Sequence, residues 1–526
     1  MKSKLLAVLV TLLAAFNTLS AQQKNLIDLQ LVKLGQSFYN IGNYYIDTVD
    51  FTSLADGAMR EILSRLDPHS TFIPASEVKA MNEQLEGNFD GIGVEFAIIR
   101  DTLTIQGVVH GGPSEKVGLR AGDKIVTVDG EEISGAGLTT VRVHKYLRGE
   151  KGTKVSVGIL RRGADRVLNF IITRGKIPVN SVDASYMLPG DIRYIKLSRF
   201  AADSYKEIMT DLTPLLQQLK GIVLDLRGNG GGYILTALRI ANEFLNKGEL
   251  ILYTEGRSMP RRDEFANGFG RLSKLPLAVL IDENSASASE IVAGAIQDWD
   301  RGLIIGRRSF GKGLVQRQFD LADGSQMRLT IARYHTPSGR VIQSPYREGD
   351  AAGYYRQFYE RYSKGEYTSR DSIHLPDSLK FYTLVNKRVV YGNGGIMPDI
   401  FIPADTSYFS EFYSNVVRKG VIVDFVNEYT DKKRDELVKI SSDSDEFANY
   451  MLTNTAFGDG LFEEFRGYAL KRGISYDSER DGNSGNEIVK QLEGLILRNM
   501  FNMTAYFKHI NRTDPEVQRA IAEIAR

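Results

Sequence analysis

Short apolar runs alternate with helical periodicity between residues 177 and 334, and this pattern restricts the fold more than any other feature of the chain. The runs have the length of buried strands, and the helical segments between them are long enough to cover a sheet. The pattern predicts an α/β fold with helices layered on a sheet and a core domain over 176–405. The strand candidates are 192–197, 222–226, 276–281, 303–305, 315–319 and 327–334, with a helix over 233–245 and a hairpin turn at Asp323-Gly324.

The regions outside this core have a helical pattern, and a chain of 526 residues is too long for one compact core. Apolar residues at helical spacing predict an N-terminal helical domain over 22–88, ending in LDPHSTFIP. A charge-mixed helical region is expected over 406–526, with loops near 458–460 and 477–486. Residues 345–383 are polar and tyrosine-rich with little periodicity, which predicts a surface insertion in the core.

Residues 1–21 have the layout of a cleavable secretory signal. Two lysines precede an apolar run from Leu5 to Phe16, and small and polar residues follow up to Ala21. The run is shorter than a membrane span requires, and no other stretch is apolar enough to cross a bilayer. We therefore expect an exported, periplasmic protein without an integral span in the mature chain. An uncleaved N-terminal anchor, which would make the protein membrane-associated, is the alternative.

The charge balance and the cysteine count exclude several classes of function. The chain has 66 Lys and Arg residues against 65 Asp and Glu residues, so no large field of one sign indicates nucleic acid as a partner. The absence of cysteine excludes a thiol nucleophile, a cysteine-ligated zinc ion and disulfides. Substrate selection must then depend on local pockets.

Residues 89–175 contain short β-type runs separated by Gly, Asp and Pro turns. Gly91, Ile92, Gly93 and Val94 precede one of these runs and offer successive backbone N–H groups to an anion. Such a loop can capture a peptide carboxylate while the peptide adds to the strand edge. An ordinary turn is the alternative for these four residues taken alone. Together with GPSEKVGLRAGDKIVTVDG, the segment resembles a PDZ domain.

Three serines alternate with alanine in SASASE, at positions 285, 287 and 289, directly before a helical pattern. Ser287 and Glu290 have the spacing of a capping box, so one serine could serve only to begin the helix. The small side chain of Ala288 instead leaves open N–H groups at the positive end of a helix, where an oxyanion is stabilised. Spacing alone does not decide which serine would be the nucleophile.

A nucleophilic serine needs a base, and Lys312 in Phe310-Gly311-Lys312-Gly313 is the candidate nearest to the serine cluster. Flanking glycines allow close backbone approach, and a buried amine would lose proton affinity. Gln316 lies four residues on, on the same face of an extended segment, where it can hold the lysine by a hydrogen bond. A solvated surface charge is the alternative for a lone lysine.

A glycine loop follows one of the predicted strands, in LDLRGNGGG at 224–232. It lacks the Gly-Lys-Ser/Thr of a phosphate loop, and the third glycine of the dinucleotide fingerprint would fall at Tyr233. The loop remains a source of free N–H groups beside the strand that leads to the serines. One such N–H and that of Ala288 would form a two-donor oxyanion hole.

Seven motifs stand in the order found in the carboxyl-terminal processing (tail-specific) peptidases, which the chain resembles over about 54–403. The resemblance implies a layered core of the ClpP/crotonase type, with Ser287 as the nucleophile, Lys312 as the general base and Gln316 as the residue that orients it. It also implies an oxyanion hole formed by the N–H groups of Ala288 and Gly231. The motifs are LDPHSTFIP, the PDZ-like segment, LDLRGNGGG, ENSASASEIVAGAIQD, GRRSFGKGLVQ, RYHTPSGRVIQ and GGIMPDI.

The resemblance implies a serine endopeptidase that cleaves proteins near their C-termini, with the PDZ domain capturing the free C-terminus of the substrate. Ser/Lys chemistry needs no metal or organic cofactor. One alternative is an adaptor that binds peptides through its PDZ domain on an inactive peptidase scaffold. Another is an acyl-CoA-handling enzyme, against which export argues because CoA is an intracellular cofactor. The resemblance does not identify the physiological substrate. It also leaves open whether the protein forms a homo-oligomer and whether it has an activating partner.

Overall fold

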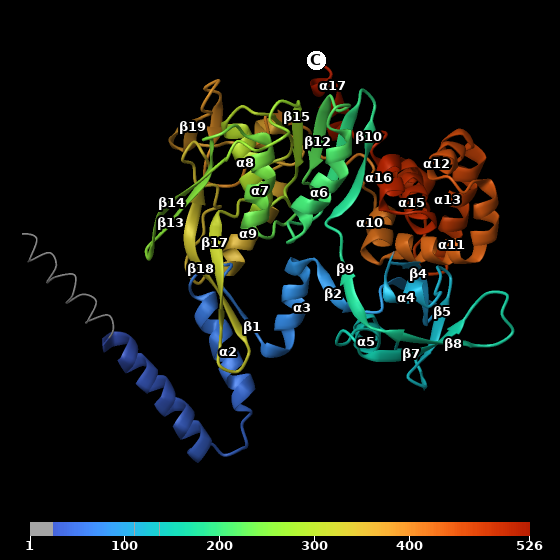
Figure 1. The fold of residues 1–526 in the computed structure, drawn as a ribbon, viewed down its shortest axis with the longest axis horizontal. Helices are drawn as coiled ribbons and strands as arrows, with labels where there is room; N and C mark the ends of the chain where they lie inside the picture. The colour runs from blue at the N-terminus through green and yellow to red at the C-terminus, as the bar shows by residue number, and fades with distance from the viewer. Residues whose placement is uncertain (1–24, 110, 136) are drawn as a thin grey trace, which may run out of the picture. The chain divides into compact units, whose positions relative to one another are not determined.

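The computed structural model describes residues 25–109, 111–135 and 137–526 (Figure 1). The predicted signal segment, 1–21, lies outside these residues. Among the described helices, none is both long and apolar enough to cross a membrane.

The chain divides into two compact units, Met1–Leu66 and Asp67–Arg526. In the first unit, residues 25–44 are helical and are followed by α2 (Phe51–Ser64). Asp50 caps α2 by accepting two backbone N–H groups of its first turn, at 3.0 and 3.2 Å. The structure thus has helices where the pattern predicts them. The segment LDPHSTFIP, however, belongs mainly to the second unit, because its strand joins the core.

A six-stranded sheet in the order β10-β11-β12-β15-β16-β21 is the centre of the second unit. Its strands are parallel except for β10, which pairs antiparallel with β11. The glycine-loop strand and the serine strand are neighbours as predicted, with Ile222 opposite Leu277. The strands are β10 (Val182–Leu188), β11 (Ile192–Leu197), β12 (Gly221–Asp225), β15 (Leu277–Ile281), β16 (Leu303–Gly306) and β21 (Ile400–Phe401).

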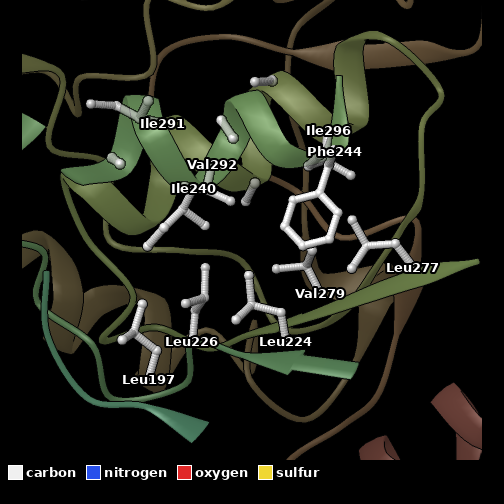
Figure 2. Close-up of a cluster of buried hydrophobic side chains, with 14 of the residues drawn as sticks. Leu197, Leu224, Leu226, Ile240, Phe244, Leu277, Val279, Ile291, Val292 and Ile296 are labelled. Carbon is white, nitrogen blue, oxygen red and sulfur yellow. The ribbon is translucent and has the colours of Figure 1, made fainter. Parts of the chain in front are cut away.

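Helices cover both faces of this sheet. Successive residues of each strand point to opposite faces, so each strand contributes side chains to both helical layers. Leu224 and Val279 face the α6, α7 and α8 layer. Figure 2 shows the part of this buried cluster that involves α7 and α8. Val223 and Leu280 face the other side and contact residues of α16 and α17. The layered α/β prediction is therefore confirmed. The helices are α6 (Ser204–Leu212), α7 (Ile234–Phe244), α8 (Ala288–Asp298), α16 (Met503–Ile510) and α17 (Pro515–Ile524).

A second, antiparallel sheet contains the hairpin predicted at Asp323-Gly324, formed by β17 and β18. Gln316 is opposite Thr330 and Gln318 is opposite Arg328 in its register. The strand of LDPHSTFIP, β1, pairs with the other edge of β18, so this motif lies beside the hairpin. The strands are β1 (Thr71–Ile73), β13 (Leu250–Gly256), β14 (Met259–Phe265), β17 (Leu314–Asp320) and β18 (Gln326–His335).

The PDZ-like domain follows α3 (Ala75–Glu86) and is entered and left by β2 and β9, which pair with each other. Its sheet has the order β3-β4-β5-β7-β8, with β6 paired to β5, and encloses its own buried apolar cluster. The elements are β2 (Asn88–Gly91), β3 (Val94–Ile99), β4 (Thr102–Val108), α4 (Pro113–Lys116), β5 (Lys124–Val128), β6 (Glu131–Glu132), α5 (Thr140–Leu147), β7 (Lys154–Leu160), β8 (Leu168–Thr173) and β9 (Gly175–Pro178).

The C-terminal region is helical as predicted, but it does not form a single layer. Helices α10 to α13 and α15 enclose their own apolar cluster, and α17 covers the central sheet. Helix α16 belongs to both, with Ala505 in that cluster and Phe507 against the sheet. The last two helices are therefore part of the core domain. The remaining helices are α10 (Glu411–Arg418), α11 (Val421–Ile440), α12 (Ser444–Thr453), α13 (Thr455–Leu470), α14 (Ser478–Asp481) and α15 (Gly485–Met500).

Two local predictions are wrong. Residues 458–460 lie inside α13 instead of in a loop, because α13 packs on α15, where Leu461 and Phe465 are buried with Ile488 and Leu492. Similarly, α15 already begins at Gly485, within the loop expected over 477–486. The insertion at 345–383 also contains a regular element, α9 (Ala351–Ser363), together with β19 (Lys380–Tyr382), which pairs with β20 (Val389–Tyr391).

Candidate active site

The three serines of SASASE have different surroundings in the structure. The Ser285 hydroxyl donates to the carbonyl of Leu226 and the Ser289 hydroxyl to that of Asn229, both at 2.8 Å, and both serines are fully buried. Ser287 is half-buried and lines a cavity of about 540 Å³. The geometry therefore singles out Ser287 as the serine that a substrate can reach, a choice that spacing alone leaves open.

Ser287 is located at a sharp turn between β15 and α8. Its backbone has φ 56° and ψ −111°, in the left-handed half of conformational space, where a residue with a side chain is strained by roughly 1–3 kcal/mol. A strained strand-to-helix turn of this kind exposes a nucleophile above a sheet. Ala288 begins α8, so its N–H has no acceptor within the helix and lies at the positive end of the helix dipole.

Lys312 lines the same cavity as Ser287. Its Nζ donates to Oε1 of Gln316 at 3.2 Å, and Nε2 of Gln316 donates in turn to the backbone carbonyl of His69. This second bond fixes which end of the Gln316 amide faces the lysine. The hydrogen bond predicted between Lys312 and Gln316 is thus present, and its outer support comes from the LDPHS motif.

The glycines beside Lys312 are required by close backbone packing. Gly311 has φ 91°, and a side chain there would lie 2.3 Å from the Ser344 hydroxyl. A side chain at Gly313 would lie 2.8 Å from the backbone nitrogen of Gln343. The loop can therefore lie against its neighbours only with glycine at both positions.

A single carboxylate holds the serine turn and the lysine loop together. Glu290 Oε2 accepts the backbone N–H groups of Ser287 and Lys312, both at 2.8 Å. Its Oε1 accepts the N–H of Gly311 at 2.7 Å and the hydroxyl of Ser309 at 2.6 Å. Burial raises the pKa of Glu290 to about 7 against the opposing effect of these hydrogen bonds. Glu290, noted in the sequence only for its capping spacing, is a positioning residue for both groups.

Burial lowers the pKa of Lys312 below its usual value of 10.5, and the positive charge of Arg328 lowers it further. Glu290 and Asp67 act in the opposite direction but do not outweigh burial. Burial, with Lys312, also lowers the pKa of His69 to about 4, so this imidazole is neutral at neutral pH. Burial thus makes the Lys312 amine easier to deprotonate, as a general base requires.

The glycine loop that follows β12 lies against the serine turn. Gly231 has φ 102°, and a side chain there would be 2.8 Å from Cβ of Ser287 and 3.0 Å from the nitrogen of Ala288. The predicted oxyanion pair, Ala288 and Gly231, is thus brought together. The N–H of Gly231, however, donates to Oδ1 of Asn229 at 2.8 Å, so it must exchange this bond before it can bind an oxyanion.

Several residues of the site were not predicted individually. Tyr334 donates to the carbonyls of Lys312 and Ser287, at 2.7 and 3.2 Å, and so joins the two loops from the side of β18. Asp67 accepts the N–H groups of His69 and Ser70 at 2.9 Å, which shapes the turn that holds Gln316. Both lie in quoted motifs, RYHTP and LDPHS, but only the fold brings these motifs to the serine.

The predicted carboxylate loop of the PDZ-like domain connects β2 to β3. Gly91 ends β2, Ile92 is buried, Gly93 has φ 76° and Val94 begins β3. The carbonyl of Ile92 is held by Ser114 of α4, through the N–H at 3.0 Å and the hydroxyl at 2.7 Å. In the sheet order β3 is an edge strand, as the addition of a peptide strand requires.

Three family profiles match the chain: peptidase family S41 over residues 191–350, a PDZ domain over 91–172, and a family of unknown function over 412–502. A carboxy-terminal-processing protease of Bartonella bacilliformis is 38% identical over 320 residues, which cover 60% of this chain and 73% of that protein. The carboxy-terminal processing protease CtpB of Bacillus subtilis is 32% identical over 327 residues, covering 61% and 68%. A solved photosystem II D1 C-terminal processing protease is 28% identical, covers 71% of this chain and 86% of its own, and has a TM-score of 0.37.

Proposed function

Because the chain belongs to the carboxy-terminal-processing proteases of peptidase family S41, we propose that it is an exported endopeptidase with Ser287 as nucleophile and Lys312 as general base. One observation carries the proposal: Lys312, held by Gln316 and with its pKa lowered by burial, lines the same cavity as the only reachable serine of SASASE. A neutral lysine beside a serine hydroxyl is a sufficient base for acyl transfer.

The reaction proceeds through an acyl-enzyme. Oγ of Ser287 bonds to the carbonyl carbon of the substrate while Nζ of Lys312 takes the hydroxyl proton. The N–H of Ala288 and a donor of the glycine loop stabilise the oxyanion. The carbon–nitrogen bond then breaks, and Lys312 returns the proton to the leaving amine. A water molecule, deprotonated by Lys312, hydrolyses the ester and restores Ser287.

The PDZ domain captures the free C-terminus of the substrate on the loop from Gly91 to Val94 and on the edge of β3. The match to a PDZ profile and the geometry of this loop support this role. We expect a peptide with a free C-terminal carboxylate to bind there and its C-terminal amide analogue not to bind. Fluorescence anisotropy of labelled peptides measures the difference. Equal binding of both would contradict carboxylate capture.

Substitution of the two reacting groups tests the chemistry. Ser287→Ala and Lys312→Met each abolish cleavage of a protein with an apolar C-terminal tail, measured by gel and mass spectrometry. Ser289→Ala serves as the control, because the hydroxyl of Ser289 is already bonded to Asn229 and does not reach the cavity. Wild-type cleavage by either dyad variant, with the fold verified by circular dichroism, would refute the dyad.

A PDZ-based adaptor without activity makes the opposite prediction for a covalent probe. A fluorophosphonate acylates Ser287 of an active enzyme and is lost in Ser287→Ala, whereas an adaptor stays unlabelled in both forms. Export is tested separately, since N-terminal sequencing of the protein from the periplasmic fraction shows whether a segment ending near Ala21 has been removed.

A further inference from the structure

The cavity that contains Ser287 has an unbalanced charge. Three basic residues line it, Arg199, Lys312 and Arg328, while its described lining includes no aspartate or glutamate. The whole chain, in contrast, has 66 basic and 65 acidic residues. With Lys312 neutral, the two guanidinium groups still give the cavity a positive field, which favours an anionic ligand.

Arg328 belongs to the same surface of the hairpin as the residue that holds the lysine. It is directly opposite Gln318, and the next pair on this face of the ribbon is Gln316 with Thr330. Gln316 and Gln318 both line the cavity with Arg328. The side chain of Arg328 is also close enough to Lys312 for its charge to lower the pKa of the amine.

The guanidinium of Arg328 has no acidic partner within the described part of the chain. Its Nη2 atom is buried without a hydrogen-bond partner, and the one titratable group that acts on it is the phenol of Tyr233. Arg199 differs, because it donates to the carbonyl of Asn180 at 3.0 Å and lies near Asp183. Arg328 is half-buried, and a partly desolvated cation without a counter-charge costs free energy that a carboxylate supplied from outside recovers.

A second source of positive potential meets the same cavity. Tyr233 and Ile234, at the N-terminus of α7, line it beside the glycine loop. The first N–H groups of an α-helix have no acceptor within the helix, and the helix dipole is positive at this end. The unpaired Arg328 and the start of this 11-residue helix therefore act on one anion-binding region.

We propose that Arg328 binds a carboxylate of the substrate inside the active-site cleft, so that the preferred substrates have an acidic side chain or a free C-terminus close to the scissile bond. This inference rests on the proposed peptidase function and adds a substrate class to it. It is distinct from carboxylate capture by the PDZ domain, because Arg328 lines the cavity of Ser287 itself.

The hairpin geometry limits where that carboxylate lies. Gln316 and Arg328 belong to neighbouring residue pairs on the same face of the ribbon, which are two residues apart along each strand. At a rise of about 3.3 Å per residue, this separation is roughly 7 Å along the ribbon. For an extended peptide that runs along this ribbon with its scissile bond level with Gln316, the carboxylate is expected about two residues from the bond that is cut.

Peptide pairs that differ only in charge test the proposal. A fluorogenic peptide carries one glutamate at each position in turn around the scissile bond, and its partner carries glutamine there. A further pair ends shortly after the scissile bond as a free acid or as an amide. We expect wild-type kcat/KM to favour the charged member by roughly tenfold at one position, as for one charge-assisted contact. The two sets distinguish a side-chain carboxylate from the C-terminus.

Arg328→Gln brings this ratio close to one, and Arg328→Lys, which keeps the charge, retains part of it. Arg333→Gln is the matched control, since Arg333 is exposed on the same strand and does not line the cavity. The proposal is overturned if every wild-type ratio stays within twofold, or if Arg328→Gln preserves the preference. The wild-type kcat/KM ratios of the charged and neutral peptides test the charge preference even where Arg328→Gln does not fold.

Binding separates this inference from the proposed function. Anisotropy with the same labelled peptides and the Ser287→Ala protein needs no turnover. If wild type cleaves nothing but the charged peptides bind more tightly in an Arg328-dependent way, the peptidase proposal fails and the anion site stands. If wild type cleaves both members of every pair equally, the peptidase proposal stands and the anion site is refuted.

Discussion

Glu290 is the residue on which the geometry of the site depends most directly, because its two oxygens accept four hydrogen bonds from the serine turn and the lysine loop. Glu290→Ala leaves these donors without an acceptor, each at a cost of about 1–3 kcal/mol when buried. We expect kcat to fall by roughly 100-fold, since small displacements of reacting groups have effects of this size. Stopped assays with the fluorogenic peptide measure the change.

Glu290→Gln keeps the volume but places an N–H₂ group among N–H donors, so it is expected to fall between wild type and Glu290→Ala. Glu283→Gln is the control, because Glu283 precedes the serine turn and pairs with Arg307 instead of the lysine loop. Full activity of Glu290→Ala would show that the two loops are held by other contacts.

The pH dependence of activity follows from the charges around Lys312. Only the neutral amine is a base, so kcat/KM rises with pH through the Lys312 pKa, which burial and Arg328 place below its usual value. Arg328→Gln removes one positive neighbour while Glu290 and Asp67 remain, so the pKa rises and the acid limb of the profile moves to higher pH. Arg333→Gln leaves the limb in place. A shift to lower pH in Arg328→Gln would contradict this assignment.

At the residue scale, sequence reasoning named candidates for the reacting groups but few of the residues that support them. Lysine as the base follows from the lack of cysteine and of a histidine near SASASE, and Gln316 follows from spacing. The preference for Ser287 came from resemblance, whereas the structure derives it from the buried hydroxyls of Ser285 and Ser289. Arg328 and Asp67 were not identified, because strand pairing across long stretches of chain brings them to the cavity.

At the scale of elements, α9 connects the surface insertion to the lysine loop. Phe358 stacks on Phe310, with ring centroids 4.2 Å apart and an angle of 13° between the planes. Arg361 donates to the carbonyls of Ser309 and Arg308 at 3.1 and 2.9 Å. Tyr354 contacts His69, whose carbonyl accepts the Gln316 amide. The insertion is therefore a support for Lys312 as well as a surface element.

Removing one aromatic ring tests this support. Phe358→Ala is expected to lower kcat by roughly tenfold or more, because the loop that carries Lys312 loses its stacked partner. Tyr359→Ala is the matched control, since the Tyr359 side chain is 77% exposed and belongs to the same helix. Both variants are compared by kcat and by thermal unfolding. Equal kcat values for the two would show that α9 does not hold the loop.

The elements that were predicted well have a clear pattern of apolar residues in the sequence. Four strands of the central sheet, β11, β12, β15 and β16, and the β17–β18 hairpin follow from apolar runs and from Asp323-Gly324, whereas β10 was not among the predicted strands. α9 was missed because the residues of its buried face include Tyr354 and Arg361, which do not give an apolar stripe. α13 was interrupted in the prediction by Gly458 and Gly460, which the structure accommodates inside the helix. In both cases tertiary contacts override the local signal.

At the scale of the whole molecule, α17 joins the catalytic core. Val517 and Ala520 are fully buried against the central sheet. Arg227, which precedes the glycine loop, pairs with Asp514 at 2.8 Å, and Arg307 pairs with Glu516 at 2.7 Å. The segment that leads into α17 is thus linked by charge to both loops that follow β12 and β16.

Ala520→Asp introduces an unpaired carboxylate into this buried interface. We expect a loss of about 3–5 kcal/mol in the free energy of unfolding, as for other uncompensated buried charges. Ala522→Asp places the same group on the exposed side of the same helix and is expected to have little effect. Trp299, the only tryptophan, follows α8 and reports unfolding of the core by its fluorescence. Similar unfolding curves for both variants would contradict the role of α17.

The position of α17 also affects when the protein becomes active during its synthesis. Ser287 and Lys312 leave the ribosome long before residues 515–524, and until then one face of their sheet lacks a cover. A nascent or prematurely terminated chain therefore contains both reacting groups on an incomplete core. We expect hydrolytic activity to appear only when this late helix docks on the sheet.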